Sequence, residues 1–69
     1  MNDDLLAYEH LYSLGPVAAS RVFGVAYVTY AQFRSGERPM MLYHQRHLEA
    51  LMLLPAAARA RLINDHANV

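Results

Sequence analysis

The chain has 69 residues, which is enough for one small domain and leaves no room for a second. Its composition is 55% hydrophobic, it contains no cysteine, and six arginines balance six carboxylates. Disulfides and a cysteine-ligated zinc therefore cannot support the core, and the net charge of zero excludes a broadly basic nucleic-acid coat or a polybasic membrane anchor. We expect self-association to support so small a core.

Charge is distributed unevenly along the chain. Residues 1–20 carry three carboxylates, from Asp3, Asp4 and Glu9, and no cation, whereas residues 21–48 carry four arginines and one glutamate. An anionic partner is therefore expected to meet the middle third of the chain. Every cation is an arginine, which favours forked contacts to phosphate, carboxylate or base edges, although a GC-rich gene would produce the same bias.

The sequence contains no signal for a membrane. No stretch approaches the roughly eighteen apolar residues that a transmembrane helix needs. The beginning of the chain, Met1-Asn2-Asp3-Asp4, lacks the basic flank of a signal peptide. We therefore expect a cytoplasmic protein without a membrane partner, and the absence of cysteine fits a reducing compartment.

The first predicted helix begins at Asn2 or Asp3, either of which can cap it, and acidic residues in its first turn suit the helix dipole. It is expected to end near Leu14, because Gly15 can close it and Pro16 cannot continue it. Its apolar face holds four residues: Leu5, Tyr8, Leu11 and Tyr12.

Pro16 suits the first position of a second helix, which runs to Phe23. Gly24 then makes a tight turn before a third helix over residues 26–35. The aromatic and β-branched residues of this third segment leave a strand as the alternative. A strand there would be alone, because no second alternating segment exists to pair with it, and this favours the helix.

The longest apolar segment, residues 40–54, predicts a fourth helix that is apolar on more than one face and so needs two neighbours. Pro55 begins a fifth helix over residues 55–65, which is rich in alanine and arginine. Together these segments predict an all-α fold, a compact five-helix domain that spans residues 1–69.

Residues 16–35 contain what a helix-turn-helix requires. Two helices joined at a steep angle need a turn residue that accepts positive φ, which Gly24 supplies. They also need small residues where the backbones meet, which Ala19 and Ser20 supply. The inward positions on both sides of the turn are apolar: Phe23, Val25, Tyr30 and Phe33.

The segment from Gly24 to Pro39, GVAYVTYAQFRSGERP, resembles the Cro/CI-type (Xre-like) helix-turn-helix family. Tyr43 and the run at residues 48–51 are also similar to small phage regulators associated with anti-CRISPR genes. The resemblance covers about residues 14–55. It implies a homodimer that inserts its third helix into the major groove of operator DNA and represses a nearby promoter of a phage or mobile element.

The resemblance also implies which residues meet the DNA. Family members usually carry serine or threonine where Ala26 stands and often glutamine where Val17 stands, so two hydrogen-bonding groups are missing here. Direct reading of base edges then depends on Tyr27, Thr29 and Gln32. The implied DNA-binding residues are Val17, Ala26, Tyr27, Val28, Thr29, Ala31, Gln32, Arg34, Arg38 and Tyr43.

Phosphate contacts in this prediction come from the arginines, Arg34 and Arg38 above all. They allow roughly three to five phosphates per protomer, so affinity is expected to be modest unless two protomers bind together. The apolar half of the fourth helix and the fifth helix supply the predicted dimer interface: Leu48, Leu51, Met52, Leu54, Leu62 and Ile63.

Other functions find less support. His44 and His47 stand three residues apart, but nothing completes a ligand set, so no metal or other cofactor is expected. No serine has the context of a nucleophile and no carboxylates are paired, so no enzymatic activity is expected. The main alternative is a protein-interaction module, such as a phage-encoded inhibitor of a host protein, that uses Tyr27, Val28 and the neighbouring alanines as an apolar docking patch.

Overall fold

The structure, a computed structural model, describes residues 1–68 and contains within them five α-helices and no strand. This confirms the predicted all-α fold, and the strand alternative for residues 26–35 is wrong. Val69, the last residue of the predicted domain, lies outside the described residues. The helices are α1 (Asp3–Tyr12), α2 (Pro16–Phe23), α3 (Tyr27–Ser35), α4 (Leu42–Leu53) and α5 (Ala56–His66).

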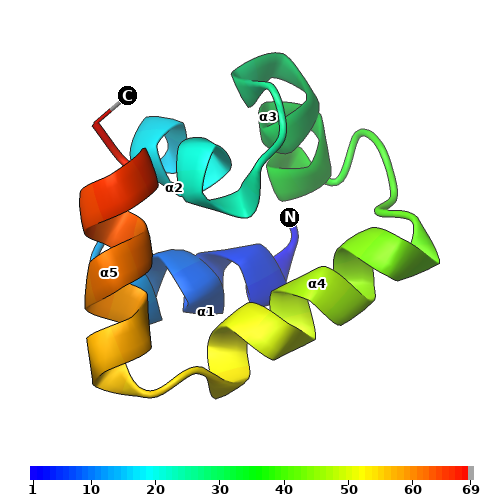
Figure 1. Cartoon of the computed structure of the whole chain (residues 1–69). Helices are drawn as coiled ribbons and strands as arrows, with labels where there is room; N and C mark the ends of the chain where they lie inside the picture. Colours follow the sequence, from blue (N-terminus) through cyan, green and yellow to red (C-terminus); the bar gives the residue numbers. More distant parts are fainter. Residues whose placement is uncertain (69) are drawn as a thin grey trace.

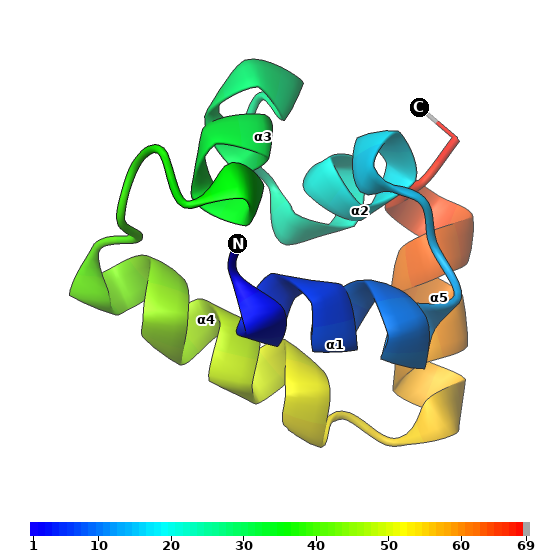
Figure 2. The same ribbon diagram turned by 180° about the vertical axis from the view of Figure 1, so that it is seen from behind.

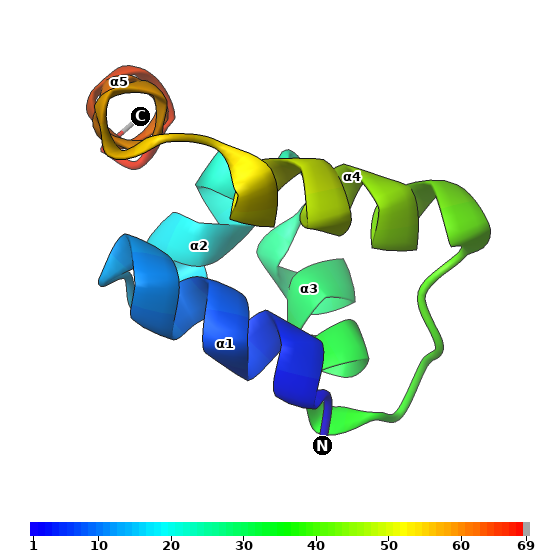
Figure 3. The same ribbon diagram turned by 90° about the horizontal axis from the view of Figure 1, so that it is seen from below.

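The helices form two layers with extents of 32 × 23 × 19 Å. α2 and α3 make one layer, and α1 and α4 make the other (Figure 1 and Figure 2). Seen from below, α1 and α4 lie in front of α2 and α3, and α5 is seen end-on at one side (Figure 3). α5 packs against α2, and α4 packs against α1.

The first helix ends earlier than the sequence predicts. Asn2 caps its beginning, and the Asn2 Oδ1 atom accepts a hydrogen bond from the Leu5 amide at 3.1 Å. Ser13, not Gly15, takes the left-handed conformation that closes the helix, with φ of 53°. The reason is Pro16, which forces the residue before it into an extended conformation, and Gly15 accordingly has φ of −75° and ψ of 172°.

The turn between α2 and α3 follows the prediction. Gly24 has φ of 88°, and its amide donates to the Ser20 carbonyl at 2.9 Å. The amide of Val25 donates to the same carbonyl at 3.2 Å. An L-residue is strained at such a positive φ, so glycine is the residue that lets the chain reverse here.

Aromatic side chains fill the centre of the molecule. The rings of Tyr8 and Tyr12 lie 4.9 Å apart between centroids, and Phe23 meets Tyr30 edge-on at 6.1 Å. Leu11, expected on the buried face of the first helix, is exposed instead. The core residues are Leu5, Tyr8, Tyr12, Ala19, Val22, Phe23, Tyr30, Phe33, Leu48, Leu51 and Ala67.

The buried tyrosines are hydrogen-bonded as well as packed. The Tyr8 hydroxyl donates to the Ala19 carbonyl at 2.8 Å, and the Tyr12 hydroxyl donates to the Leu51 carbonyl at 2.6 Å. Leu51 lies in the last turn of α4, where carbonyls lack a partner within the helix. Tyr12 therefore joins the end of α1 to the end of α4. Burial raises the pKa of both tyrosines above its ordinary value.

Two of the six residues of the predicted dimer interface are used inside the chain. Leu48 and Leu51 are only 4% and 5% exposed, because this face of α4 packs against α1 within the same chain. Little of either side chain is therefore left for a second copy. The other four predicted residues are half-buried and pack at the margin of the core: Met52, Leu54, Leu62 and Ile63.

The fourth helix is shorter than predicted, because Pro55 keeps Leu54 extended and the helix begins only after Met41. The fifth helix runs one residue beyond its predicted end, to His66. Across residues 1–68, none of the helices combines the length and the apolar character that crossing a bilayer requires.

Candidate functional site

The outer side of α3 is the most prominent feature that the sequence singles out. Tyr30 and Phe33 on the inner side are buried in the core, whereas Tyr27 is 47% exposed and Val28 is 68% exposed. α3 lies at the edge of the molecule in both side views, with its first turn farthest from α1 and α4 (Figure 1 and Figure 2). The first turn of α3 is therefore accessible to a large partner.

A buried carboxylate fixes the inner side of α3. Glu9 of α1 is only 8% exposed, and its Oε2 atom accepts a hydrogen bond from the Tyr30 hydroxyl at 2.7 Å. Arg34 binds the same carboxylate through two nitrogens, Nε to Oε2 at 2.8 Å and Nη2 to Oε1 at 3.2 Å. Two consecutive turns of α3 are thus attached to one residue of α1.

This network changes the role of Arg34. Its guanidinium is less available to phosphate than the sequence indicates, because two of its nitrogens already bind Glu9 and the side chain is only one-third exposed. The hydrogen bond with Glu9 raises the pKa of Arg34. Burial, together with the hydrogen bond to Glu9, raises the pKa of Tyr30. Arg34 therefore helps to position α3 on α1.

A second contact also holds the C-terminal end of α3. The amide of Asn2 donates to the Arg34 carbonyl at 2.8 Å, so the residue that caps α1 also satisfies a carbonyl in the last turn of α3. Gly36 closes α3 with φ of 86° and lies against the backbone of Met1. The beginning of the chain and the end of α3 are therefore held together.

The residues of α3 that were predicted to contact DNA bases differ in how exposed they are. Thr29, Ala31 and Gln32 are half-buried, so they are less accessible than Tyr27 and Val28. Ala26 is exposed at the N-cap of α3, and no side chain there accepts a hydrogen bond from the first turn. The amides at the beginning of α3 are therefore available to an acceptor from a partner.

The remaining predicted residues lie around α3. Arg38 is exposed in the loop after it, with its guanidinium carbon 5.9 Å from the centroid of the Phe33 ring. Tyr43 is exposed in the first turn of α4 and stacks on His44, which in turn contacts Phe33. Val17 is 47% exposed in the first turn of α2. Arg38 and Tyr43 thus flank one end of α3.

Two other arginines have partners within the chain. Arg21 donates to the carbonyl of Ala67 at 3.1 Å, and Arg59 donates to the carbonyl of Leu54 at 2.7 Å. Both contacts attach α5 to its neighbours. The positive charge of the middle third is therefore less available to an anion than the sequence suggests.

The histidines also make contacts within the chain. The Nδ1 atom of His44 accepts from the Met41 amide at 3.3 Å, and the Nε2 atom of His47 lies 3.2 Å from the Phe23 carbonyl. Over residues 1–68, no three His, Asp or Glu side chains lie close enough together to hold a metal ion.

Sequence reasoning missed Glu9 as a structural residue. Its signal is positional: Glu9 follows Leu5 by four residues and precedes Tyr12 by three, which places it on the buried face of the helix. A carboxylate on such a face requires a partner. Its partners could not be identified, because Arg34 is 25 residues away in the sequence.

No family model, curated protein or solved structure gives a significant match to this chain.

Proposed function

We propose that the chain is a DNA-binding transcriptional regulator in which α2, the turn at Gly24 and α3 form a helix-turn-helix. In this proposal the first turns of α3 enter the major groove of a short operator, and the protein represses a nearby promoter of a phage or mobile element. The function rests on the resemblance of residues 24–39 to the Cro/CI-type family. It has no enzymatic component.

One structural observation supports the proposal above the others. α3 is attached to the core along one side through Tyr30 and Phe33, while Val28 on its outer side is 68% exposed. A reading helix must combine these two properties, because it has to protrude while keeping its orientation. Gln32, Tyr27 and Thr29 supply the hydrogen-bonding groups, and Val28 suits a thymine methyl group.

A specific observation also favours the second candidate, a module that docks on a host protein. The two exposed side chains in the first turn of α3, Tyr27 and Val28, are largely apolar, and the arginine on this helix is bound to Glu9. Phosphate binding then depends on Arg38, on Arg46 of α4, which is exposed, and on backbone amides at helix ends. An exposed apolar patch with little charge is typical of protein-binding surfaces.

A titration with DNA from upstream of the protein's own gene tests the first candidate. Fluorescence anisotropy is expected to give binding that weakens linearly on a plot of log K against log salt, with a slope of about −0.9 per phosphate neutralised. Absence of binding at low salt to any such fragment would contradict the proposal.

Two substitutions separate the roles of the side chains. Arg38→Ala should weaken binding to all sequences evenly and reduce the steepness of the salt dependence by about one, because it removes one cation from a phosphate. Gln32→Ala should cost about 1–3 kcal/mol of discrimination at one base pair. Equal effects of both changes on every sequence would contradict these roles.

The second candidate predicts a different result. Val28→Asp would then abolish binding of one stoichiometric host protein, while Arg38→Ala would leave that complex unchanged. Binding of the wild-type chain to a purified host protein, without any DNA binding at low salt, would favour this candidate over the first.

We also propose that the regulator acts as a homodimer, since roughly one or two phosphate contacts per protomer give little affinity. The remaining candidates for the interface lie on α5 and in the segment that joins it to α4: Leu54, Leu62 and Ile63. Met52 lies between α4 and α1 instead. Two protomers related by a two-fold axis would match a palindromic operator.

A further inference from the structure

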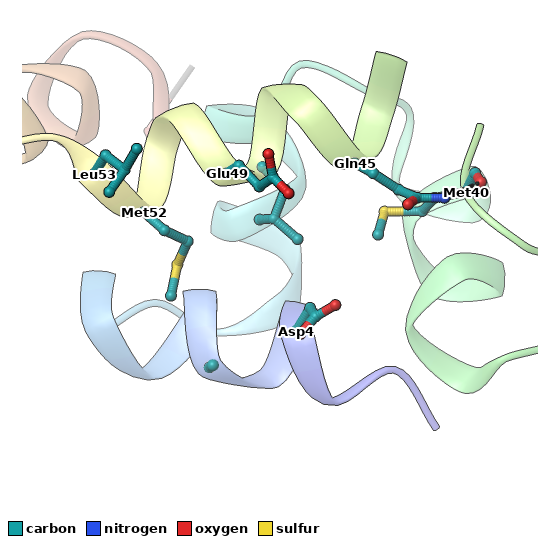
Figure 4. A pocket seen from close by; sticks show the side chains of 8 residues that line it. Asp4, Met40, Gln45, Glu49, Met52 and Leu53 are labelled. Atoms are coloured by element: carbon teal, nitrogen blue, oxygen red, sulfur yellow. Dashed lines mark hydrogen bonds between the residues drawn. The ribbon is translucent and has the colours of Figure 1, made fainter. Parts of the chain in front are cut away.

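An open groove lies between α1 and α4 (Figure 4). These two helices form the layer opposite α2 and α3 (Figure 3). Its volume is about 390 Å³, within the range of about 300–1,000 Å³ that is common for binding sites. None of the DNA-binding residues predicted above lines it. Its walls include Asp4 and Ala7 from α1 and Met40, Glu49, Met52 and Leu53 from α4 and the segment before it.

The groove is elongated along α4. Met40 lies at one end and Met52 and Leu53 lie at the other (Figure 4). From Gln45 to Leu53 the groove follows α4 for about 12 Å, slightly more than two turns of a helix. Leu53 is 84% exposed, so a small ligand in this groove would leave much apolar surface in water.

The floor of the groove is adaptable and apolar. Leu48 forms part of it, and the thioether side chains of Met40 and Met52 can adjust to the shape of an apolar side chain. Exposed leucine beside such a groove is the pattern by which amphipathic helices are bound. Apolar side chains of the occupant are therefore expected to insert between Met40 and Leu53.

The charge of the groove selects the occupant. Asp4 stands on the α1 side and Glu49 on the α4 side, and the lining residues include no cation. Two carboxylates repel the phosphates of DNA. They also disfavour a symmetric contact with a second copy, in which identical surfaces meet. A helix with lysine or arginine on either side of its apolar stripe would complement both walls.

We propose that this groove docks a basic amphipathic helix of another protein. The apolar side chains of that helix would pack on Met40, Met52 and Leu53, and its flanking cations would lie beside Asp4 and Glu49. The docking does not depend on what α3 binds. Because the groove lies between α1 and α4, which form the layer opposite α3, both partners can be held at the same time.

A model peptide tests the proposal on the intact chain. The probe is a capped peptide of about fifteen residues built from leucine, alanine and lysine, with leucine at i, i+4, i+7 and i+11, long enough to form a helix. Amide chemical shifts are expected to change at Ala7, Gln45, Glu49 and Leu53 and not on α3. The same peptide with glutamate in place of lysine should bind at least tenfold more weakly.

Matched substitutions test whether the peptide binds in the groove. The residues changed are exposed, so the fold should be retained. Glu49→Lys and Leu53→Ser should each weaken peptide binding at least tenfold. Glu37→Lys in the loop and Leu42→Ser in the first turn of α4 make the same chemical changes outside the groove and should leave it unchanged. DNA binding, where present, should survive Leu53→Ser.

Three results would overturn the proposal. The first is chemical-shift change on α3 in place of the groove, and the second is equal binding of the glutamate peptide. The third is conversion of a dimer into a monomer by Leu53→Ser, which would assign the groove to a second copy of this chain.

Discussion

At the scale of single residues, Glu9 determines how α3 is oriented. Its carboxylate accepts hydrogen bonds from the Tyr30 hydroxyl at 2.7 Å and from the Arg34 Nε atom at 2.8 Å, and the residue is only 8% exposed. A buried carboxylate with both charge and hydrogen bonds satisfied stabilises one arrangement of the two helices over others. Removing one partner would leave the buried carboxylate incompletely paired and would lower the free energy of unfolding.

Removing members of this network should destabilise the protein unequally. Tyr30→Phe deletes one hydrogen bond to a charged group and should lower the free energy of unfolding by about 1.5–3 kcal/mol. Glu9→Ala should lower it more, because it leaves the Tyr30 hydroxyl unsatisfied and frees Arg34. Urea unfolding followed by circular dichroism measures both. The double variant should be less destabilised than the sum, since the two residues interact directly.

The buried tyrosines make stability sensitive to alkali. Burial raises the pKa of Tyr8, Tyr12 and Tyr30 above the ordinary value of 10.0. Their contribution is fully present below about pH 10, where folded and unfolded chains are both protonated. Above this pH the unfolded chain loses protons that the folded chain retains, so the free energy of unfolding should fall, by up to about 1.4 kcal/mol per pH unit for each tyrosine.

Urea midpoints measured between about pH 8 and pH 12 test this expectation. Tyrosinate absorbance should rise together with the loss of helical circular dichroism, because ionisation of the three buried hydroxyls is coupled to unfolding. Constant stability over this interval would contradict the burial of these side chains.

At the scale of elements, the second half of α3 is attached to the rest of the chain by hydrogen bonds, and its N-terminus has no capping side chain. Glu9 and Asn2 fix its second half, whereas its N-cap is Ala26, whose side chain accepts no hydrogen bond. The backbone of Ala26 already has the extended geometry of an N-cap, with φ of −60° and ψ of 145°. A residue with a side-chain acceptor would therefore fit without rearrangement.

Ala26→Ser should raise the free energy of unfolding by about 0.5–1 kcal/mol, because its hydroxyl can accept a hydrogen bond from the first turn. Under the proposed function it should also strengthen DNA binding, since a hydroxyl at this position can donate to phosphate. Ala57→Ser on the exposed side of α5 serves as the control and should produce neither gain. Greater stability with unchanged affinity for DNA would separate capping from phosphate binding.

At the scale of the whole molecule, the small size of the chain gives oligomerisation a role in stability. Only eleven hydrophobic residues in residues 1–68 are buried in the core, and the network of Glu9 supplements them. Self-association at the corner of α4 and α5 would cover further apolar surface. Leu48 and Leu51 are already used inside the protomer, so this interface is smaller than the sequence indicates.

A homodimer predicts that thermal stability depends on concentration. A tenfold increase should raise the free energy of unfolding of the dimer by about 1.4 kcal/mol, which corresponds to a few degrees in Tm. Sedimentation equilibrium at micromolar concentration should give the mass of two chains. A Tm independent of concentration together with the mass of one chain would contradict the dimer.

The sequence by itself determined the number and places of the helices in residues 1–68 and the turn at Gly24. Glycine and proline act locally, and periodic apolar residues define a face whatever the neighbours are. Even the error at Ser13 is local, because the restriction that Pro16 places on Gly15 can be inferred from the sequence.

Only the tertiary structure decided which side chains remain free for function. Arg34 looked available until Glu9, 25 residues earlier, was found to bind it, and Leu51 looked like an interface residue until it was found buried beside Tyr12 of α1. The groove between α1 and α4 likewise exists only once both helices are packed. Pairings between distant residues depend on how helices meet in space, and one sequence records the pattern of each helix without recording its neighbour.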